Sequence, residues 1–279
     1  MYNLKIGVIE TIQDILEMGV SKLDLVGLTE IQLNCWQIDL CTEENARKIK
    51  DLFGDKYTIS GIWGGWNVGP TVWNFVDGPQ TIGLVPREWR QSRMDGLKKV
   101  MDFAHHLNVK TVTTHMGFMP ENPNTIEYRE ILDCLFELCS YADKYGILFC
   151  FETGQETPTT LLRAIQDMKK RGLNNLRINL DPANLLLYGK GNPLDALDVF
   201  GQYVVGIHVK DGDYPTDGDN LGSEYKVGTG RVNFEVLISK LQKLGYQGPL
   251  TIEREISGEQ QIKDILDTIN FLENILENL

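Results

Sequence analysis

The amino-acid sequence predicts an α/β protein in which residues 1–279 fold as one (β/α)₈ barrel, a single domain. Three observations lead to this prediction: short apolar runs alternate with amphipathic segments from end to end, eight such runs occur, and the length is 279 residues. Eight parallel strands close a small barrel, which commonly uses about 250 residues. An open, doubly wound sheet is the alternative. However, the sequence has no G-x-G-x-x-G after the first run and no GKS or GKT, which argues against the nucleotide-binding forms of the doubly wound sheet.

The eight predicted strands read mostly as near-continuous apolar stretches rather than as strict alternation of apolar and polar residues. This pattern is typical of parallel strands that are covered on both faces. The predicted strands are Lys5–Glu10, Glu30–Trp36, Tyr57–Ile62, Thr111–Met116, Ile147–Glu152, Leu176–Asp181, Val204–Lys210 and Leu250–Arg254.

Helices are predicted between these runs, because apolar residues recur there at the spacing that places them on one helical face. Pro158 and Asn192-Pro193 look like helix starts, and Gly146 looks like a helix stop. The clearest stripes are Leu97, Val100, Met101 and Ala104 within Arg87–Leu107; Tyr128, Ile131, Leu132, Leu135, Leu138, Cys139 and Ala142; and Ile262, Ile265, Leu266, Ile269 and Leu272.

Two long segments interrupt this alternation. Trp63–Pro86 is rich in glycine and aromatic residues, and Gly212–Arg231 is polar and rich in glycine. Each follows a predicted strand, on the side where barrels keep their active sites. Loops longer than about 12–15 residues in a compact domain are usually functional or disordered. We therefore expect these two segments to border a site.

Composition excludes several classes of partner. Lys and Arg total 27 and Asp and Glu total 39, so the net charge is −12 and the pI is about 4.8. Nucleic acids and anionic membranes need clustered positive charge, so neither is an expected partner. The N-terminus lacks the pattern of a signal peptide and no apolar run is long enough to span a membrane, which predicts a cytoplasmic protein. The five widely spaced cysteines are expected to be reduced thiols.

Four ionisable residues stand at the ends of the last four predicted strands. Glu152 and Asp181 end theirs, and His208 and Glu253 lie near the ends of theirs, at spacings of 29, 27 and 45 residues. Adjacent strands lie about 4.8 Å apart, so the four side chains can converge. Three carboxylates in one pocket would repel each other unless a divalent cation joined them. Mn²⁺, Co²⁺, Mg²⁺ or Zn²⁺ suits oxygen ligands with one imidazole. Each residue alone would more often be a cap or an ion pair.

Further residues are candidates for contact with a substrate, each with a structural alternative. His115 ends the fourth strand. Glu156 either faces the pocket or caps the helix that begins near Pro158. Lys210 points away from the residue adjacent to it on its strand, which leaves its direction open. Trp63 and Trp66, with Trp73 nearby, either pack against a sugar or form a cluster that anchors their loop.

At these motifs the sequence resembles the sugar phosphate isomerase/epimerase family, the xylose-isomerase-like TIM barrels. The segments that carry the resemblance are FET at 151–153, NLDPAN at 179–184, GIHVKDG at 206–212, VGTGRVNFEVLISKLQKLGYQGPL at 227–250 and TIERE at 251–255. The resemblance implies that Glu152, Asp181, His208 and Glu253 bind one divalent metal, often Mn²⁺ or Co²⁺, and that the two Glu are an acid/base pair. It also implies a homo-oligomer.

This resemblance implies a metal-dependent isomerase or epimerase that acts on a ketose or sugar phosphate through an enediolate. Ketose 3-epimerases usually carry a His where this sequence has Asn184, a further candidate for contact with the substrate, so their substrate preference does not transfer directly to this sequence. Two alternatives are a metal-dependent dehydratase of a polyol-derived ketone and a non-catalytic sugar-binding barrel. Lys210, Lys226 and Arg231 either bind a phosphate or are solvated charges. The few histidines and the negative charge argue against a related DNA-repair nuclease.

Overall fold

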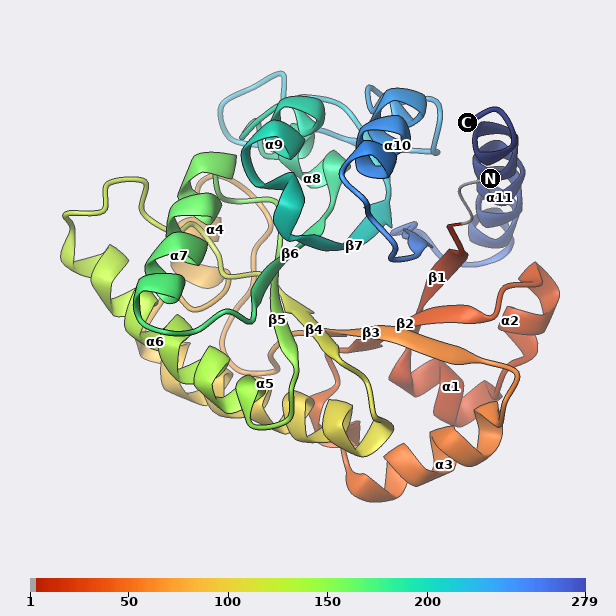
Figure 1. Cartoon of the computed structure of the whole chain (residues 1–279), viewed down its shortest axis with the longest axis horizontal. Coiled ribbons are helices and arrows are strands. Elements are labelled where there is room, and N and C mark those ends of the chain that lie inside the picture. Colours follow the sequence, from red (N-terminus) through yellow and green to blue (C-terminus); the bar gives the residue numbers. More distant parts are fainter. Residues whose placement is uncertain (1–3) are drawn as a thin grey trace.

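A computed structural model, which describes residues 4–279, contains a closed barrel of eight parallel strands surrounded by helices (Figure 1). The order of strands around the barrel is β1-β10-β7-β6-β5-β4-β3-β2. The predicted (β/α)₈ TIM barrel is thus confirmed, and the open sheet is wrong. The strands are β1 (Ile6–Thr11), β2 (Glu30–Cys35), β3 (Thr58–Gly64), β4 (Thr111–Thr114), β5 (Leu148–Glu152), β6 (Leu176–Leu180), β7 (Val204–Val209) and β10 (Leu250–Ile252).

Each of the eight predicted apolar runs overlaps one barrel strand, and β1 and β3 extend past the predicted ends to Thr11 and Gly64. The predictions run too far at the carboxyl ends of several strands: β6 stops before Asp181, β7 before Lys210 and β10 before Glu253. At this rim the chain leaves the sheet to enter loops and helices. The loop after β7 also contains a two-stranded antiparallel hairpin that was not predicted, β8 (Asp211–Gly212) with β9 (Glu224–Tyr225).

The helices form the outer layer of the barrel (Figure 1). Helices α7 and α9 begin at Pro158 and Pro193, which confirms both predicted starts. The helices are α1 (Ile12–Met18), α2 (Ser21–Val26), α3 (Glu43–Phe53), α4 (Gly78–Thr81), α5 (Arg87–Leu107), α6 (Ile126–Asp143), α7 (Pro158–Lys170), α8 (Pro182–Leu187), α9 (Pro193–Phe200), α10 (Phe234–Lys243) and α11 (Glu259–Glu277), with 3₁₀ turns η1 (Ile38–Leu40) and η2 (Gly201–Tyr203).

The predicted apolar stripes bury most of their residues, but two details differ. Leu266 of α11 is 38 % exposed although Ile265 and Leu272 beside it on the helix are buried, so the stripe is narrower than predicted. Gly146 does not end α6 directly, because the helix stops at Asp143. Instead, Gly146 has a φ of +63°, a conformation that glycine adopts without strain, and turns the chain into β5.

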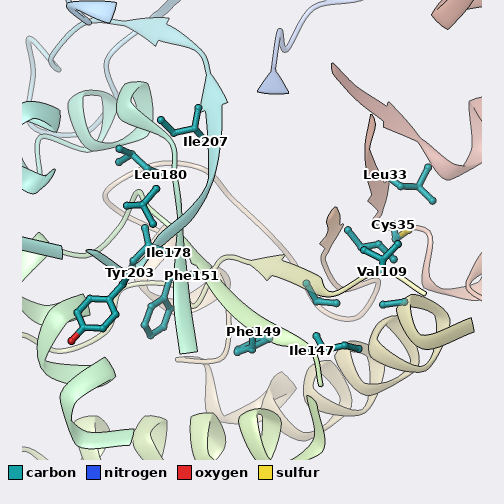
Figure 2. Packing of buried hydrophobic residues seen from close by; sticks show 14 of the residues in the cluster. Leu33, Cys35, Val109, Ile147, Phe149, Phe151, Ile178, Leu180, Tyr203 and Ile207 are labelled. Carbon is teal, nitrogen blue, oxygen red and sulfur yellow. The ribbon is translucent and has the colours of Figure 1, made fainter. Parts of the chain in front are cut away.

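The residues of each strand alternate between the layer under the helices and the barrel interior, as the pleat of a strand requires. Phe149 and Phe151 of β5 and Ile178 and Leu180 of β6 belong to the apolar layer (Figure 2). The intervening positions face inward, where Cys150, Asn179 and Thr251 line a small polar space in the barrel axis. The same alternation carries Glu152, Asp181, His208 and Lys210 to the inner side of the carboxyl rim.

All five cysteines are free thiols in the part of the chain that the structure describes, and Cys41 is the one that is not buried. This agrees with the expectation of reduced thiols. Among the helices of residues 4–279, none combines the length and the apolar character needed to cross a membrane.

Candidate metal centre

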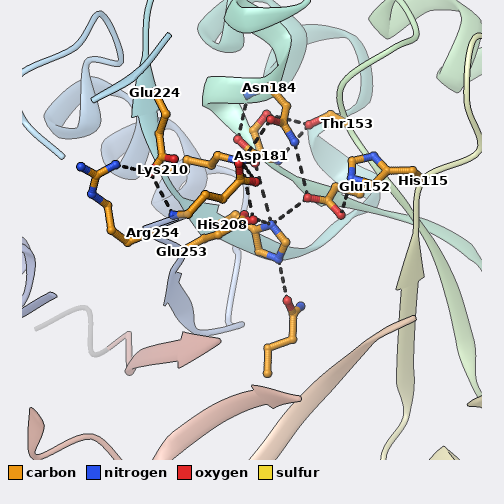
Figure 3. Close-up of polar contacts among 12 residues, drawn as sticks. His115, Glu152, Thr153, Asp181, Asn184, His208, Lys210, Glu224, Glu253 and Arg254 are labelled. Carbon is orange, nitrogen blue, oxygen red and sulfur yellow. Dashed lines mark hydrogen bonds and ion pairs between the residues drawn. The ribbon is translucent and has the colours of Figure 1, made fainter. Parts of the chain in front are cut away.

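Four neighbouring strands place the four predicted ligands at one point of the carboxyl rim. Glu152 is the last residue of β5, His208 lies in β7, and Asp181 and Glu253 directly follow β6 and β10. Figure 3 shows these side chains pointing toward one another. All four are buried, and one potential ligand atom from each lies within 4.8 Å of those of the other three.

His208 lies at the centre of this group. Its Nδ1 is 2.8 Å from Glu253 Oε2, 3.1 Å from Glu152 Oε1 and 3.9 Å from Asp181 Oδ2. Metal–ligand bonds of about 2.0–2.3 Å put the ligands of one ion within roughly 4.6 Å of each other. The four donors are therefore spaced nearly as the ligands of a single ion, with Nδ1 as the nitrogen ligand.

Asp181 owes its position to the start of α8. Its Oδ1 accepts a hydrogen bond from the backbone N–H of Asn184 at 2.9 Å, as an N-cap does. Thr153 holds the backbone of the same residue: its Oγ1 accepts from the Asp181 N–H at 2.8 Å and donates to the Asp181 carbonyl at 2.7 Å. These contacts leave Asp181 Oδ2 free to face the centre.

The donor set fits a divalent cation. Glu152 Oε2, Asp181 Oδ2 and Glu253 Oε2 are buried, and no residue of the described chain donates a well-formed hydrogen bond to any of them. Buried carboxylate oxygens without a partner carry a large desolvation cost. A cation bound by one oxygen of each carboxylate and by His208 Nδ1 would reduce that cost, and three carboxylates with one imidazole suit Mn²⁺, Co²⁺, Mg²⁺ or Zn²⁺.

The pKa values of this group reflect both burial and mutual charge. Burial raises the pKa of Asp181 well above its ordinary value, although Lys210 opposes the shift. Burial would also raise the pKa of Glu253, but the positive charges of Lys210 and His208 overcome it and hold that pKa below its usual range. Burial alone would lower the pKa of His208, and Glu253 and Glu152 raise it to about 10 instead. Without a cation, His208 and Lys210 thus supply the positive charge.

Lys210 belongs to this centre, which settles the direction of its side chain. It is 2 % exposed, and its Nζ lies 3.6 Å from Asp181 Oδ2 and 3.5 Å from Glu253 Oε1. It also donates to Glu255 Oε1 at 2.5 Å and to Asn184 Oδ1 at 3.3 Å. Because Lys210 stands two residues after His208, both side chains face the barrel interior.

Two of the predicted substrate contacts adjoin the ligand Glu152. His115 Nε2 lies 3.2 Å from Glu152 Oε2, and Asn184 Nδ2 lies 3.5 Å from Glu152 Oε1. Burial lowers the pKa of His115 below its ordinary value. A neutral imidazole is therefore favoured at the edge of the centre.

Glu156 is buried, and the described residues offer no hydrogen bond to either of its carboxyl oxygens. Burial raises its pKa to about 8. The alternative reading of Glu156 as a helix cap is wrong, because Thr157 occupies the N-cap position of α7. The side chain is thus a buried carboxyl whose protonated form burial favours, and it is not among the residues that line the cavity beside the metal centre.

A cavity of about 310 Å³ adjoins the metal centre, and its wall is largely aromatic. Trp63, His115 and Asn184, three of the candidates for contact with a substrate, line it. Trp36 and Trp63 lie 5.6 Å apart between ring centroids, and Trp73 lies 5.1 Å from His115. The remaining lining residues are Asn34, Leu187, Tyr188, Leu221 and Glu255.

Trp66 does not line this cavity, so the structure does not bring this predicted contact into the pocket. Its ring packs against Trp36 at 4.8 Å, and its Nε1 donates to Thr71 Oγ1 at 2.7 Å. Arg93 of α5 covers the same ring, with the guanidinium carbon 4.7 Å from the ring centroid. Trp66 therefore anchors the loop between β3 and α5, which was the alternative reading of this tryptophan.

Arg93 holds this loop from beneath. It is fully buried, and its guanidinium donates to the carbonyls of Thr81 and Gly83 at 2.8 and 2.6 Å and of Pro70 and Val68 at 2.9 and 3.2 Å. Burial lowers its pKa to about 10. One side chain thus fixes four points of the segment that carries Trp63 and Trp73.

We predict that Arg93→Met lowers the free energy of unfolding by about 3 kcal/mol, because each buried carbonyl that loses its partner costs about 1–3 kcal/mol. Urea denaturation followed by circular dichroism measures the change. The exposed Arg129 of α6 provides the matched control Arg129→Met, which is expected to change stability by less than about 0.5 kcal/mol. Equal stability of Arg93→Met and the control would contradict the role of Arg93.

The two other basic candidates for a phosphate site lie outside this cavity. Lys226 forms an ion pair with Asp267 of α11 at 2.9 Å. Arg231 is exposed and lines a separate cavity beside Pro193 and Asn233. Neither therefore supplies positive charge to the aromatic cavity.

Several residues of the site carried no signal in the sequence. Trp36 and Asn34 enter the cavity from the carboxyl end of β2, and Glu255 enters it from the loop after β10. Gln32 of β2 reaches His208 from across the barrel, with 2.6 Å between Gln32 Oε1 and His208 Nε2. The carboxyl-end rule would have marked Trp36 and Asn34, whereas Gln32 lies in mid-strand and only the fold reveals it.

Comparison with known proteins yields similar chains of one architecture. Residues 29–275 match a family model described as xylose isomerase-like TIM barrel. A solved xylose isomerase domain protein from Planctomyces limnophilus is 31 % identical, with a TM-score of 0.89 over 99 % of this chain and 97 % of that chain. A solved D-tagatose 3-epimerase-like protein has 22 % identity and a TM-score of 0.70 over 98 % and 97 % of the two chains, a likeness of fold.

Among curated proteins, an uncharacterized protein of Methanocaldococcus jannaschii is 26 % identical over 199 residues. The match covers 65 % of this chain and 64 % of that protein, so it spans slightly less than two thirds of the relative's length.

Proposed function

Because the chain belongs to the xylose isomerase-like TIM barrel family, we propose that it is a divalent-metal-dependent isomerase or epimerase of a sugar. The observation that carries the proposal is the convergence of Glu152, Asp181, His208 and Glu253, three of which hold a buried carboxylate oxygen without a hydrogen bond. Such a cluster stores electrostatic cost that a bound cation would relieve.

These four side chains would hold the metal, and we propose Mn²⁺ as the resident ion, ahead of Co²⁺, Mg²⁺ and Zn²⁺. Three oxygen donors and one nitrogen donor suit this group of ions. When bound, the ion would supply positive charge that polarises the substrate carbonyl and lowers the energy of negative charge developing on its oxygen.

Glu152 and Glu253 would be the acid/base pair. They extend from β5 and β10, on either side of β6 and β7, so they approach the centre from opposite sides. One carboxylate would take the proton from the carbon next to the carbonyl, and the other carboxyl would return a proton to the opposite face. If the proton returns to the carbon that lost it, the configuration of that carbon is inverted. If the proton is added to the neighbouring carbon instead, the ketose becomes an aldose.

The surrounding side chains would orient the sugar. His115 and Asn184 line the cavity and contact the carboxylate of Glu152, so they are placed to bind hydroxyl groups beside the reacting carbon. Trp63 and Trp73 offer flat apolar faces to the C–H side of a sugar ring.

The charge of the cavity favours a sugar without a phosphate group. None of the lining residues in the described chain is Lys or Arg, and Glu255 adds a negative charge. Lys210 is already engaged by Glu255, Asp181 and Glu253. A phosphate dianion would gain no cationic partner in this cavity, so we propose a free ketose as substrate rather than a sugar phosphate.

Proton exchange tests the proposed reaction. The Mn²⁺-loaded protein, incubated with a panel of free ketoses in D₂O, is expected to incorporate one deuterium into the product at the carbon next to the carbonyl. Nuclear magnetic resonance and mass spectrometry of the products measure the label. The phosphorylated forms of the same sugars are expected to exchange at least tenfold more slowly.

The protein treated with a chelator serves as the control and is expected to lose exchange, which returns when Mn²⁺ is added. Binding of sugars without exchange anywhere in the panel would contradict catalysis and favour a non-catalytic sugar-binding barrel.

A dehydratase is the second candidate, because of the position of Lys210. Its ammonium lies 3.5 Å from Glu253 Oε1, and if a substrate replaced one of its carboxylate contacts, it could donate to a hydroxyl that leaves from the carbon beside the one that loses its proton. Such an elimination releases water and forms an unsaturated ketone that absorbs in the ultraviolet. The lyase would be favoured if this absorbance appears with a polyol-derived ketone and no deuterium-labelled epimer of the substrate is formed.

A further inference from the structure

A chain of polar contacts leads from the metal centre into the barrel interior. The ring of His208 presents Nδ1 to the three carboxylates, and its Nε2 lies 2.6 Å from Gln32 Oε1. The amide nitrogen of Gln32 then donates to Asn179 Oδ1 at 3.4 Å. His208, Gln32 and Asn179 are all at most 5 % exposed, so these contacts are removed from solvent.

This chain crosses the barrel. Gln32 comes from β2 and Asn179 from β6, which stand four strands apart in either direction around the ring of eight. The barrel leaves room for the crossing at Gly206 of β7, where an added Cβ would lie 2.2 Å from Asn179 Oδ1. The contacts are thus built into the interior of the barrel rather than onto a mobile rim loop.

The direction of the Gln32 amide decides which nitrogen of His208 can bind a metal. A carbonyl oxygen facing Nε2 accepts a hydrogen bond, so it keeps the ring proton on Nε2 and leaves the lone pair of Nδ1 for the ion. The reversed amide would donate to Nε2 and move the proton to Nδ1. The structure has the first arrangement, in which the amide nitrogen of Gln32 donates to Asn179 Oδ1.

We infer that Gln32 is a positioning residue that holds His208 as the Nε2–H tautomer with Nδ1 toward the carboxylates, with Asn179 as the acceptor of its amide nitrogen. The inference rests on the metal site of the proposed function and adds two residues to it. A hydrogen bond of this kind to a ligating histidine typically changes metal affinity by about 10–100-fold.

The test is the affinity for Mn²⁺, measured by competition with a chelator of known affinity. Gln32→Met keeps the length of the side chain but cannot accept from Nε2–H, and it is expected to weaken Mn²⁺ binding by about 10–100-fold. Gln32→Glu restores a stronger acceptor and is expected to bind Mn²⁺ at least as tightly as the natural protein. The Asn179 amide, whose Nδ2 has no partner among the described residues, can turn to donate to the new carboxylate.

Thr113→Val is the matched control, since Thr113 is also buried, lines the same interior space and forms no hydrogen bond with His208. It is expected to leave Mn²⁺ affinity within about twofold. Urea denaturation of the metal-free variants separates loss of affinity from loss of folding.

A second measurement needs no variant and remains decisive if Gln32→Met fails to fold. Nitrogen-15 magnetic resonance of the Zn²⁺-loaded natural protein is expected to find the His208 proton on Nε2 and the metal on Nδ1. Metal on Nε2, or Mn²⁺ affinity of Gln32→Met equal to that of Thr113→Val, would overturn the inference. Absence of Mn²⁺ and Zn²⁺ binding to the natural protein would instead overturn the proposed function on which it rests.

Discussion

Replacement of Glu253 by Gln is expected to lower kcat/KM by about 10²–10⁴-fold, the contribution of a positioned acid or base. The amide keeps the shape of the side chain and one oxygen that can bind a metal, but it cannot take up a proton. Glu152→Gln is expected to have an effect of the same size, because the proposed reaction needs one base and one acid. Steady-state kinetics on the best sugar of the panel measures both.

The two variants also differ in a way that a merely structural defect would not reproduce. With one carboxylate remaining, a proton can still leave and return on a single face of the substrate. Each variant is therefore expected to incorporate deuterium into only one of the two epimers. The epimer labelled by Glu152→Gln is expected to be the one that Glu253→Gln leaves unlabelled.

The exposed Glu44 supplies the control Glu44→Gln, which is expected to retain the activity of the natural protein. Metal content is measured in every variant, so that loss of the ion is distinguished from loss of a base. Full turnover in either Glu152→Gln or Glu253→Gln would rule out the two-base scheme.

Asp181→Asn is expected to have opposite effects on metal binding and on the stability of the metal-free protein. The ion loses a charged ligand, so Mn²⁺ affinity is expected to fall by at least 100-fold and activity with it. In the metal-free protein, however, burial raises the pKa of Asp181, so the folded state disfavours its charge. The neutral amide removes that penalty, and the melting temperature without metal is expected to rise.

The pH dependence follows from the same shift. A carboxyl whose pKa is raised by folding binds more protons in the folded than in the unfolded state, so it destabilises the protein as pH rises above its ordinary pKa of 3.8. The stability advantage of metal-free Asp181→Asn is therefore expected to grow from about pH 4 upward. Scanning calorimetry with and without Mn²⁺ measures it.

The natural protein with Mn²⁺ is the reference for these scans. It is expected to be more stable than its own metal-free form, whereas the variant is expected to gain almost nothing from the ion. An equal gain in melting temperature from Mn²⁺ in both proteins would contradict a ligand role for Asp181.

The barrel and the four ligand candidates were accessible from the sequence because both are local patterns repeated at regular spacing. Each strand is marked by an apolar run, and each run ends at the same rim. A polar residue at the end of a run, such as Glu152 or Asp181, therefore has a place at this rim that the sequence alone defines. The spacing of 27 and 29 residues between these runs reflects one strand and one helix each.

The rest depends on contacts between distant segments, which leave no local pattern. Gln32 contacts His208 across 176 residues of sequence, and its strand position gives no hint of the direction of its amide. Arg93 looks like one more charged residue of a long amphipathic helix, yet it is fully buried beneath the loop.

The tryptophans illustrate the same limit. Trp63 lies near the end of β3 and Trp66 stands three residues later in the loop that follows, but Trp63 lines the cavity and Trp66 packs behind it. Spacing in an irregular loop does not define a face, as it does in a strand or helix. Only the partner on the other side, Arg93 for Trp66 and His115 for Trp63, separates the two roles.

The most direct measurement is anomalous X-ray diffraction from crystals of the protein loaded with Mn²⁺. One peak is predicted at the carboxyl rim, bound by Glu152, Asp181, Glu253 and Nδ1 of His208 at about 2.0–2.3 Å. A peak elsewhere, or none in this cluster from protein saturated with Mn²⁺, would contradict a metal centre built by these four side chains.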